Sequence, residues 1–297
     1  MIPVQLVHPD TYIPDRMRGK VLLVTGAAIG SIGGCAAIRA GREGAKVACV
    51  DCKVQELAAS IAEIQNAGGE AIAIVADVAS AADADRMVRE TVEAFGKLDI
   101  VLNAAGVMDG TVPGAPADFA NQKALLPNRI HEASDEYWHK VFASNVTGIF
   151  YSMRAELKQM ISQKAGGSIV NIGSIAALTG LPGNPAYVAS KHAVTGLTRN
   201  AAIDYAPYGI RVNSVNMAQT DTPMVARAYE YVAWAMAQGT SAAMAGAKTQ
   251  SLLQINNPKH RGSTPWEQAA IILFLLSDDA SNITGAAYAT DGGWTAY

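Results

Sequence analysis

Residues 21–34 read VLLVTGAAIGSIGG, a short apolar run that leads into a turn rich in glycine. The valines and leucines predict a strand, and the apolar residues that follow at helical spacing predict a helix over 32–42. Glycines between a strand and a helix let the backbone turn sharply and approach a phosphate, which the helix N-terminus attracts. The stretch therefore predicts a strand–turn–helix unit that binds a phosphate-containing ligand.

The same alternation of short apolar runs and helical patterns continues along the chain. Further strands are expected at 46–50, 71–75, 98–102, 167–172, 210–215 and 286–289. Further helices are expected at 54–67, 82–95, 136–161, 186–205 and 265–276. Such alternation is typical of a parallel sheet with helices on both faces. We therefore expect an α/β fold with a doubly wound parallel sheet, in one domain over 19–297.

Three segments do not follow this alternation. Residues 1–18 form an N-terminal arm, whose prolines and scattered apolar residues leave open disorder or packing across a neighbouring subunit. Residues 107–134 form a long loop with turn-type residues at Gly110, Pro113, Gly114 and Pro116. Residues 222–264 are rich in Ala and Met and are expected to form a lid. Long loops in a compact domain are usually functional or disordered.

The composition excludes several classes of partner. Half of the residues are apolar, 16% are charged and the net charge is −3, with no block of Lys or Arg. These values predict a folded chain without a nucleic-acid or anionic-membrane partner. No segment approaches the roughly 18 apolar residues of a membrane span, and residues 1–18 do not resemble a secretory signal. We expect a cytoplasmic protein.

The three cysteines are not expected to bind a metal. Cys49 and Cys52 have the spacing C-x-x-C, but Cys49 falls within an apolar strand pattern and Cys52 just after it. Together with Cys35 they form an odd, clustered set, which favours reduced thiols with a structural role.

Asp51 stands at the end of the second expected strand, about 20 residues after the glycine turn. A carboxylate at this point can accept hydrogen bonds from both hydroxyl groups of a ribose, and it repels a 2′-phosphate. The same residue is also suited to cap the helix that begins at Val54. Lys53 is nearby, but its direction is open. We predict that the cofactor is NAD rather than NADP.

Further along the chain, several short blocks occur in a fixed order, and together they resemble the classical short-chain dehydrogenases/reductases. The resemblance extends from about Gly19 to Trp294. The matching blocks are Thr25-Gly26…Gly33, Asp77-Val78, Asn103-Ala-Ala-Gly106, Asn145, Ile169-Val-Asn-Ile-Gly-Ser174, Tyr187-x-x-x-Lys191, Arg211-Val-Asn-Ser-Val215, Thr222-Pro-Met224 and Asp291-Gly-Gly293.

The resemblance implies a Rossmann-type, cytosolic and usually tetrameric enzyme, and it assigns further residues to the cofactor. Asp77 and Val78 would contact the adenine, and Asn103 would hold the turn beside the adenosine ribose. Thr220 and Thr222 keep the positions that bind the carboxamide and the pyrophosphate in the family.

The chain departs from the family pattern in three places. The glycine turn after Gly26 has one residue more than usual, so either Gly30 or Ser31 is the inserted one. We expect the backbone amides of Ser31 and Ile32 to meet the phosphates. The usual Pro-Gly after the sixth strand is replaced by Met217-Ala218, and the 107–134 loop is longer than is typical.

Tyr187 and Lys191 are four residues apart on an expected helix, so they share one face. A free tyrosine has a pKa near 10, which a neighbouring ammonium and an oxidised nicotinamide would lower enough for Tyr187 to act as acid and base. By the resemblance, Lys191 would also bind the nicotinamide ribose, Ser174 the substrate oxygen, and Asn145 a water that links Lys191 to solvent. His192 is expected to pack or face solvent.

The sequence thus predicts an NAD(H)-dependent oxidoreductase that transfers a hydride between nicotinamide and a secondary alcohol or ketone. Aromatic and methionine residues in the expected lid favour an apolar, aromatic or alicyclic small-molecule substrate. Two alternatives stay open: an NADPH-dependent 3-oxoacyl carrier-protein reductase and a non-catalytic dinucleotide-binding regulator. We expect no metal, and a homo-oligomer, by resemblance a tetramer.

Overall fold

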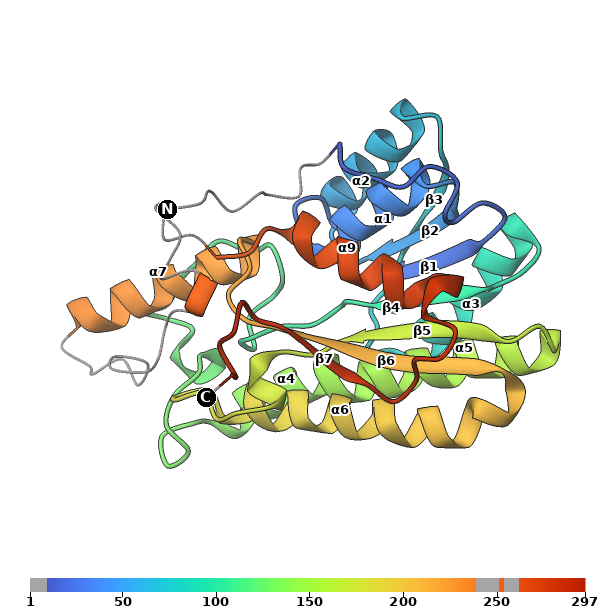
Figure 1. The fold of residues 1–297 in the computed structure, drawn as a ribbon. Helices are drawn as coiled ribbons and strands as arrows, with labels where there is room; N and C mark the ends of the chain where they lie inside the picture. Colours follow the sequence, from blue (N-terminus) through green and yellow to red (C-terminus); the bar gives the residue numbers. More distant parts are fainter. Residues whose placement is uncertain (1–9, 239–250, 254–261, 297) are drawn as a thin grey trace.

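A sheet of seven parallel strands forms the centre of the computed structural model, which describes residues 10–238, 251–253 and 262–296 (Figure 1). The strands are β1 (Val21–Thr25), β2 (Lys46–Asp51), β3 (Glu70–Val75), β4 (Ile100–Asn103), β5 (Gly167–Ile172), β6 (Ile210–Met217) and β7 (Ala287–Thr290). Their order in the sheet is β3-β2-β1-β4-β5-β6-β7. The order reverses between β1 and β4, and ligands of such sheets bind at this point, beyond the carboxyl ends of the strands.

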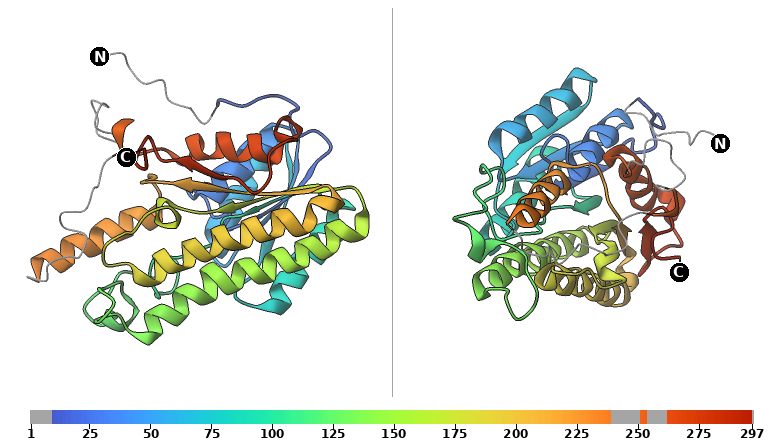
Figure 2. Two further views of the ribbon diagram at one scale, coloured as in Figure 1. Left: turned by 60° about the horizontal axis from the view of Figure 1, so that its bottom comes forward. Right: turned by 90° about the vertical axis from the view of Figure 1, so that its left-hand side faces the viewer.

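Helices cover both faces of the sheet (Figures 1 and 2). The helices are α1 (Ile32–Arg42), α2 (Val54–Asn66), α3 (Ala81–Phe95), α4 (Asp135–Phe142), α5 (Gly148–Gln163), α6 (Pro185–Tyr205), α7 (Pro223–Ala237) and α9 (Pro265–Leu276). One hydrophobic core lies between the sheet and α1, α2 and α9, and a second lies between the sheet and α3, α5 and α6. Among the described residues, no helix has both the length and the apolar character that a bilayer span requires.

The central strand β1 supplies side chains to both cores. Leu22 and Val24 belong to the first core and Leu23 to the second, and all three are fully buried. Successive side chains of a strand point to opposite faces, so a strand covered on both sides reads as an unbroken apolar run. Burial of one such side chain stabilises the fold by about 1.5–3 kcal/mol.

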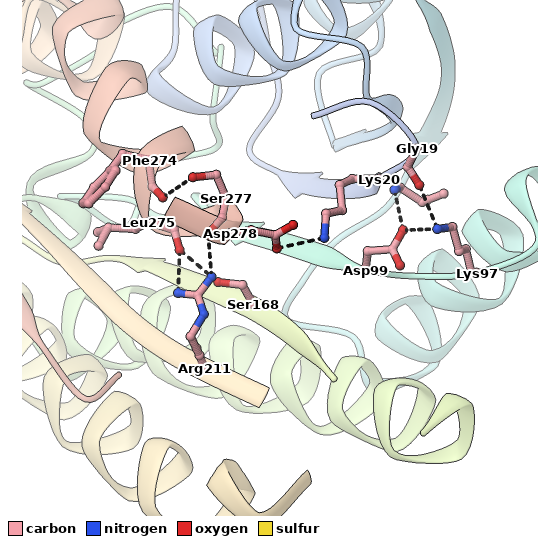
Figure 3. Close-up of polar contacts among 11 residues, drawn as sticks. Gly19, Lys20, Lys97, Asp99, Ser168, Arg211, Phe274, Leu275, Ser277 and Asp278 are labelled. Carbon is pink, nitrogen blue, oxygen red and sulfur yellow. Dashed lines mark hydrogen bonds and ion pairs between the residues drawn. The ribbon is translucent and has the colours of Figure 1, made fainter. Parts of the chain in front are cut away.

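The amino ends of the strands are tied to the end of α9 by polar contacts (Figure 3). Arg211, in β6, donates to the carbonyl oxygens of Leu275 and Ser277 at 2.8 and 2.9 Å. Lys20, just before β1, pairs with Asp278 at 3.0 Å. The last carbonyls of a helix have no donor within it, so the guanidinium satisfies groups that would otherwise be orphaned. This end of the sheet is therefore held by structural contacts.

The described part of the N-terminal arm packs on its own chain. Arg16 forms an ion pair of 2.6 Å with the buried carboxylate of Glu43, and the backbone N–H of Ile13 donates to the same carboxylate at 3.1 Å. Met17 is fully buried in the first core. These contacts hold residues 13–17 on their own chain, and packing of the arm on a neighbouring subunit stays a prediction. The arm's residues 1–9 lie outside the described residues.

The sequence prediction of one long helix over 136–161 was wrong in detail. The segment is divided into α4 and α5 by a π-helical turn at Ala143–Thr147. Such turns are rare and occur frequently at functional sites, and this one contains Asn145. The ends of the other predicted strands and helices differ from those of the structure by at most two residues.

The expected lid over 222–264 begins as helix α7. Its residues 239–250 and 254–261 lie outside the described residues. Residues 123–125 form a single helical turn within the 107–134 segment, which otherwise has no regular structure.

Candidate active site

The turn between β1 and α1 brings backbone to the carboxyl end of the sheet. Gly26 has a φ of +70°, and a Cβ there would stand 2.7 Å from the backbone nitrogen of Ala105. A Cβ on Gly33 would overlap the carbonyl oxygen of Gly26. Only glycine therefore permits this close packing of turn, helix and neighbouring strand. A bare backbone at a helix N-terminus fits the phosphates of a dinucleotide.

The two residues predicted to donate to the phosphates, Ser31 and Ile32, differ in the partners of their backbone N–H groups. The backbone N–H of Ser31 donates to the carbonyl of Ala28 at 3.1 Å, so it already serves the turn. The Ser31 hydroxyl caps α1, because it accepts from the backbone N–H of Gly34 at 2.9 Å. Ile32 is the first residue of α1, and N–H groups of a first helical turn have no acceptor within the helix. The assignment of a phosphate stays a prediction for Ile32.

Asp51 is the last residue of β2 and lies beside the glycine turn, with 8% of its surface exposed. Its carboxylate accepts from the backbone N–H groups of Ala28 and Lys53, both at 3.0 Å. A carboxylate has about four acceptor positions, so these two bonds leave room for ribose hydroxyls. The Cδ atom of Lys53 lies 3.2 Å from where a Cβ on Gly114 would stand.

Asp77 and Val78 follow β3 at the same end of the sheet. The Asp77 side chain is exposed, and its Oδ1 accepts from the backbone N–H of Ala79 at 2.9 Å. The Val78 side chain packs closely against Gly148 of α5. Their position at the carboxyl end of β3 agrees with the predicted adenine contact, which stays a prediction.

Asn103 directs its side chain into the interior rather than into the crevice. Its amide donates to the carboxylate of Glu156 at 3.0 Å and to the side-chain oxygen of Asn171 at 3.1 Å. Asn171 donates in turn to Thr198 at 3.0 Å. The network therefore joins the ends of β4 and β5 to α5 and α6. Burial raises the pKa of Glu156 to about 8, and the bond from Asn103 partly offsets this.

Thr220 and Thr222 lie between β6 and α7. The Thr220 hydroxyl shares a hydrogen bond of 2.9 Å with the hydroxyl of Ser263. The Thr222 hydroxyl caps α7, because it accepts from the backbone N–H of Val225 at 3.3 Å. Both side chains thus have structural partners, and their predicted cofactor contacts stay predictions.

Tyr187 and Lys191 occupy the first two turns of α6, and both are buried, with exposures of 9% and 5%. The Lys191 Nζ lies 5.7 Å from the centre of the Tyr187 ring. It donates to the carbonyl of Ile172, at the end of β5, at 2.8 Å. The helical spacing predicted from the sequence therefore brings phenol and ammonium to the same end of the sheet.

Ser174 follows β5 and lies next to the Tyr187 hydroxyl. Its own hydroxyl hydrogen-bonds to Tyr187, which lowers the pKa of the phenol. The Asn216 side chain, from β6, accepts from the backbone N–H of Ser174 at 3.2 Å. A Cβ on Gly173 would overlap this Asn216 oxygen, so glycine is required between strand and serine.

The sequence predicted that Lys191 and an oxidised nicotinamide together lower the pKa of Tyr187. Among the groups of the protein itself, burial is the largest effect and raises this pKa, while the hydrogen bond from Ser174 lowers it. The combined effect of Lys191 and the nicotinamide stays a prediction. Burial also lowers the pKa of Lys191 to about 8.

Asn145 uses its whole side chain to hold neighbouring segments. Its Oδ1 accepts from the backbone N–H of Val107 at 2.8 Å, and its Nδ2 donates to the Val107 carbonyl at 2.9 Å. Nδ2 also donates to the hydroxyl of Ser190, which itself donates to the Tyr187 carbonyl. Asn145 therefore anchors the start of the 107–134 segment to α6. The predicted water contact stays a prediction.

Sequence reasoning missed three supporting residues. Ser190 links Asn145 to the backbone of Tyr187, and Asn216 holds the backbone of Ser174. A Cβ on Gly106 would stand 3.1 Å from Asn145 Oδ1 and 3.7 Å from Lys191 Nζ. Ser190 lies within the Tyr187-x-x-x-Lys191 block, Gly106 ends the block that begins at Asn103, and Asn216 follows the block that ends at Val215. The bonds from Asn145 to Ser190 and from Ser174 to Asn216 join residues more than 40 positions apart, which the sequence pattern does not reveal.

His192 and the cysteines lie outside this constellation. His192 is exposed, and its ring Nδ1 is 3.0 Å from the Val188 carbonyl, in agreement with the expectation from the sequence. Cys35 and Cys49 are buried free thiols, and burial raises the pKa of each to about 12. Cys52 is exposed and also free.

The arrangement therefore combines a glycine turn at a helix N-terminus, a carboxylate at the end of β2, and a phenol with a hydroxyl and an amine beside it. These groups come from different strands and meet beyond the carboxyl ends, where the strand order reverses. A phenol hydrogen-bonded to a hydroxyl can exchange a proton with a substrate oxygen held at the same point. The buried amine supplies positive charge on the same helix.

Known proteins share these features. A family model described as short chain dehydrogenase matches residues 20–232. A 3beta-hydroxysteroid dehydrogenase of Mediterraneibacter gnavus is 38% identical over 296 residues, which cover 96% of this chain and 98% of that protein. A cyclohexanol dehydrogenase of an Acinetobacter species is 35% identical over 286 residues, which cover 96% of this chain and 99% of that protein.

Solved structures agree with the sequence matches. The crystal structure of a short chain dehydrogenase from Mycobacterium paratuberculosis bound to NAD gives a TM-score of 0.81 at 29% identity, covering 95% of this chain and 100% of the other. The order of strands and the matched residues thus lead to one conclusion. The chain belongs to the short-chain dehydrogenase/reductase family, whose members interconvert alcohols and ketones with a nicotinamide dinucleotide.

Proposed function

We propose that the protein is an NAD(H)-dependent oxidoreductase that interconverts a cyclic, largely apolar secondary alcohol and its ketone. The observation that carries this proposal is the buried contact between the hydroxyls of Tyr187 and Ser174, with Lys191 one helical turn further along α6. A bound nicotinamide supplies the hydride acceptor for oxidation and the hydride donor for reduction.

Tyr187 is the acid and base of the proposed reaction. In alcohol oxidation its phenolate takes the hydroxyl proton of the substrate, and in ketone reduction its phenol returns a proton to the developing alkoxide. Ser174 donates to the substrate oxygen and stabilises the charge that develops there. Because burial raises the pKa of Tyr187, the phenol form dominates at neutral pH and the base form grows at alkaline pH.

Lys191 and Asn145 keep this pair in place. The Lys191 ammonium is fixed by the Ile172 carbonyl, from which it can reach a ribose hydroxyl beside the phenol. Asn145 fixes the backbone of the Tyr187 turn through Ser190. Positive charge near the phenol favours its ionised form, so a charged Lys191 assists proton removal.

Asp51 supports a preference for NAD over NADP. Its carboxylate stands where β2 ends, beside the glycine turn, and a 2′-phosphate at this point would be repelled. This negative charge counts against the NADPH-dependent 3-oxoacyl carrier-protein reductase that the sequence left open.

The proposed substrate class rests on the relatives and on the residues near the site. The named relatives act on a 3beta-hydroxysteroid and on cyclohexanol, both of which carry a secondary hydroxyl on a ring. In this chain the rings of Phe119, Tyr231 and Trp234 pack against one another between the 107–134 segment and α7, which follow β4 and β6. We infer that these segments border the substrate, which favours a ring over a charged acyl carrier.

The test is a panel of cyclic secondary alcohols from cyclohexanol to a 3β-hydroxysteroid, each assayed with NAD and with NADP by the absorbance of the reduced cofactor. We expect turnover with NAD at a kcat/KM at least about tenfold above that with NADP, equal to about 1.4 kcal/mol. Faster turnover with NADP would favour the reductase alternative. Tight NADH binding without turnover of any member would favour the non-catalytic alternative.

A further inference from the structure

The segment 107–127, termed the strap below, contacts the candidate site at two separate places. At its start, both backbone groups of Val107 are bound by the Asn145 side chain. In the middle of the strap, Gly114 lies against the side chain of Lys53, and Lys53 follows Asp51 by two residues in the sequence. The strap therefore passes across the region in which we place the dinucleotide.

Helix α7 presents one face to the strap. Arg227, Tyr231 and Trp234 follow one another at intervals of four and three residues, which places them on the same side of a helix. The ring of Phe119, from the strap, lies 5.6 Å from that of Tyr231 and 5.9 Å from that of Trp234. The Tyr231 hydroxyl donates to the carbonyl of Pro127 at 2.8 Å.

Arg227 makes the polar part of this contact. Its guanidinium donates to the carboxylate of Asp109 at 3.3 Å, to the Thr111 hydroxyl at 3.0 Å and to the Ala115 carbonyl at 3.0 Å. It also lies 5.6 Å from the centre of the Phe119 ring. One planar group thus binds three points of the strap and stacks near a fourth, a geometry that a lysine cannot reproduce.

Asp109 is fixed from its own side as well. Its Oδ1 accepts from the backbone N–H of Thr111 at 2.9 Å and from the Thr111 hydroxyl at 2.5 Å. The side chains of Arg227 and Asp109 are 21% and 18% exposed, so the ion pair is largely shielded from water. A shielded pair with several hydrogen bonds is held more firmly than a surface pair.

The other end of α7 touches the glycine turn. The point where a Cβ on Gly30 would stand is 3.9 Å from Cγ of Pro223, the first residue of α7. The body formed by α7 and the strap therefore borders the crevice at the glycine turn, at Asn145 and near Asp51. Any movement of α7 that keeps the Arg227 contacts must carry the strap with it.

We propose that Arg227 is a positioning residue that joins α7 to the strap, so that the two move as one body and together form the outer wall of the substrate site. The role of this wall toward the alcohol or ketone rests on the proposed function. The joining itself rests only on the contacts between Arg227, the strap and the aromatic rings. An experiment can therefore refute the substrate-wall role without refuting the contact between α7 and the strap.

Hydrogen exchange tests the joining without any assay of activity. In the wild type, we expect peptides from 109–127 and from 223–237 to exchange at matching rates and to gain protection together when NADH is added. Arg227→Met keeps an unbranched aliphatic side chain, shorter than that of arginine, and removes the charge and the donors. We expect α7 then to exchange at least about tenfold faster than in the wild type. Glu230→Gln, at an exposed position of the same helix, is the matched control and should exchange like the wild type.

Kinetics test the wall. We expect Arg227→Met to raise KM for the alcohol about tenfold or more while the Kd for NADH changes less than about twofold, and Arg227→Lys to restore only part of the loss. Independent exchange of the two segments in the wild type, or unchanged exchange in Arg227→Met, would overturn the joining. If the two segments exchange at matching rates in the wild type but Arg227→Met leaves KM for the alcohol unchanged, the proposed role as a substrate wall is overturned. If the wild type turns over no alcohol, the proposed function fails while the exchange result still decides the joining.

Discussion

The ammonium Nζ of Lys191 donates a hydrogen bond of 2.8 Å to the carbonyl oxygen of Ile172, the last residue of β5. Ser174 stands two residues further along the chain, and Tyr187 stands one helical turn before Lys191. This contact joins the strand that leads to the serine to the helix that carries the tyrosine. The geometry of the candidate site therefore depends on an amine that is buried.

Burial of the Lys191 ammonium lowers the free energy of unfolding, and Lys191→Met should remove this destabilisation. The pKa of Lys191 is about 8 in the folded protein against an ordinary value of 10.5, so unfolding takes up a proton between these pH values and stability rises with pH through this window. At pH 7 the difference corresponds to about 3 kcal/mol, and loss of the hydrogen bond to Ile172 offsets about 1 kcal/mol.

We therefore expect Lys191→Met to be inactive yet about 2 kcal/mol more stable than the wild type at pH 7, with the gain lost by pH 10.5. Urea unfolding at pH 7 and at alkaline pH measures this difference. A variant that is less stable than the wild type by the same amount at every pH would contradict the prediction.

Ser174→Ala should change both the rate and the pH dependence of alcohol oxidation. The Ser174 hydroxyl lowers the pKa of Tyr187, so its removal raises that pKa further and moves the acid limb of the oxidation profile to higher pH. Loss of a donor to the developing charge costs about 10²–10³ in kcat. The pH profile of kcat/KM measures the shift. Ser162→Ala, at an exposed position of α5, is the control, and an unmoved acid limb in Ser174→Ala would count against the contact.

Asp51→Asn should weaken the discrimination between the two cofactors. The substitution keeps the size of the side chain but removes the charge that repels a 2′-phosphate. We expect the ratio of kcat/KM for NADH to that for NADPH to fall about tenfold or more. Steady-state rates with both cofactors give this ratio. Asp85→Asn, on the exposed face of α3, should leave it unchanged, and an equal loss with both cofactors in Asp51→Asn would refute the assignment.

Glu156→Gln should stabilise the protein at and above neutral pH. Because burial raises the pKa of Glu156 to about 8 from 4.5, the stability that its protonated form contributes is full below pH 4.5 and is lost as pH rises through 8. A glutamine can still accept the bond from Asn103 and never ionises. We expect its Tm to exceed that of the wild type by more than about 3 °C at pH 8, with little difference at pH 4.5. A lower Tm at pH 8 in calorimetry would mean that the ionised carboxylate stabilises the core.

Features that depend on local spacing could be predicted from the sequence. Alternating patterns predicted the parallel sheet with its covering helices, and a separation of four residues predicted that Tyr187 and Lys191 share a face of one helix. Asp51 was expected at the end of β2 because the apolar pattern stops there. Each of these inferences needs only a few neighbouring residues.

The features that were missed depend on contacts between distant parts of the chain. The π-helical turn at Ala143–Thr147 lies within a sequence that reads as one helix, and its Asn145 binds Val107, 38 residues earlier in the chain. The docking of Arg227 on Asp109 joins residues 118 positions apart, and neither has a marked pattern around it. The raised pKa of Tyr187 follows from burial, which the spacing of the motif does not reveal.

The most direct test of the proposed chemistry is the turnover of Tyr187→Phe with a cyclic secondary alcohol that the wild type oxidises, together with a fluorescence titration of NADH. Removal of one hydroxyl leaves the ring and its packing in place. We expect kcat to fall by a factor of about 10⁴ while the Kd for NADH stays within about threefold of the wild type. Turnover comparable to the wild type in the folded variant would contradict the role of Tyr187 as the group that moves the proton.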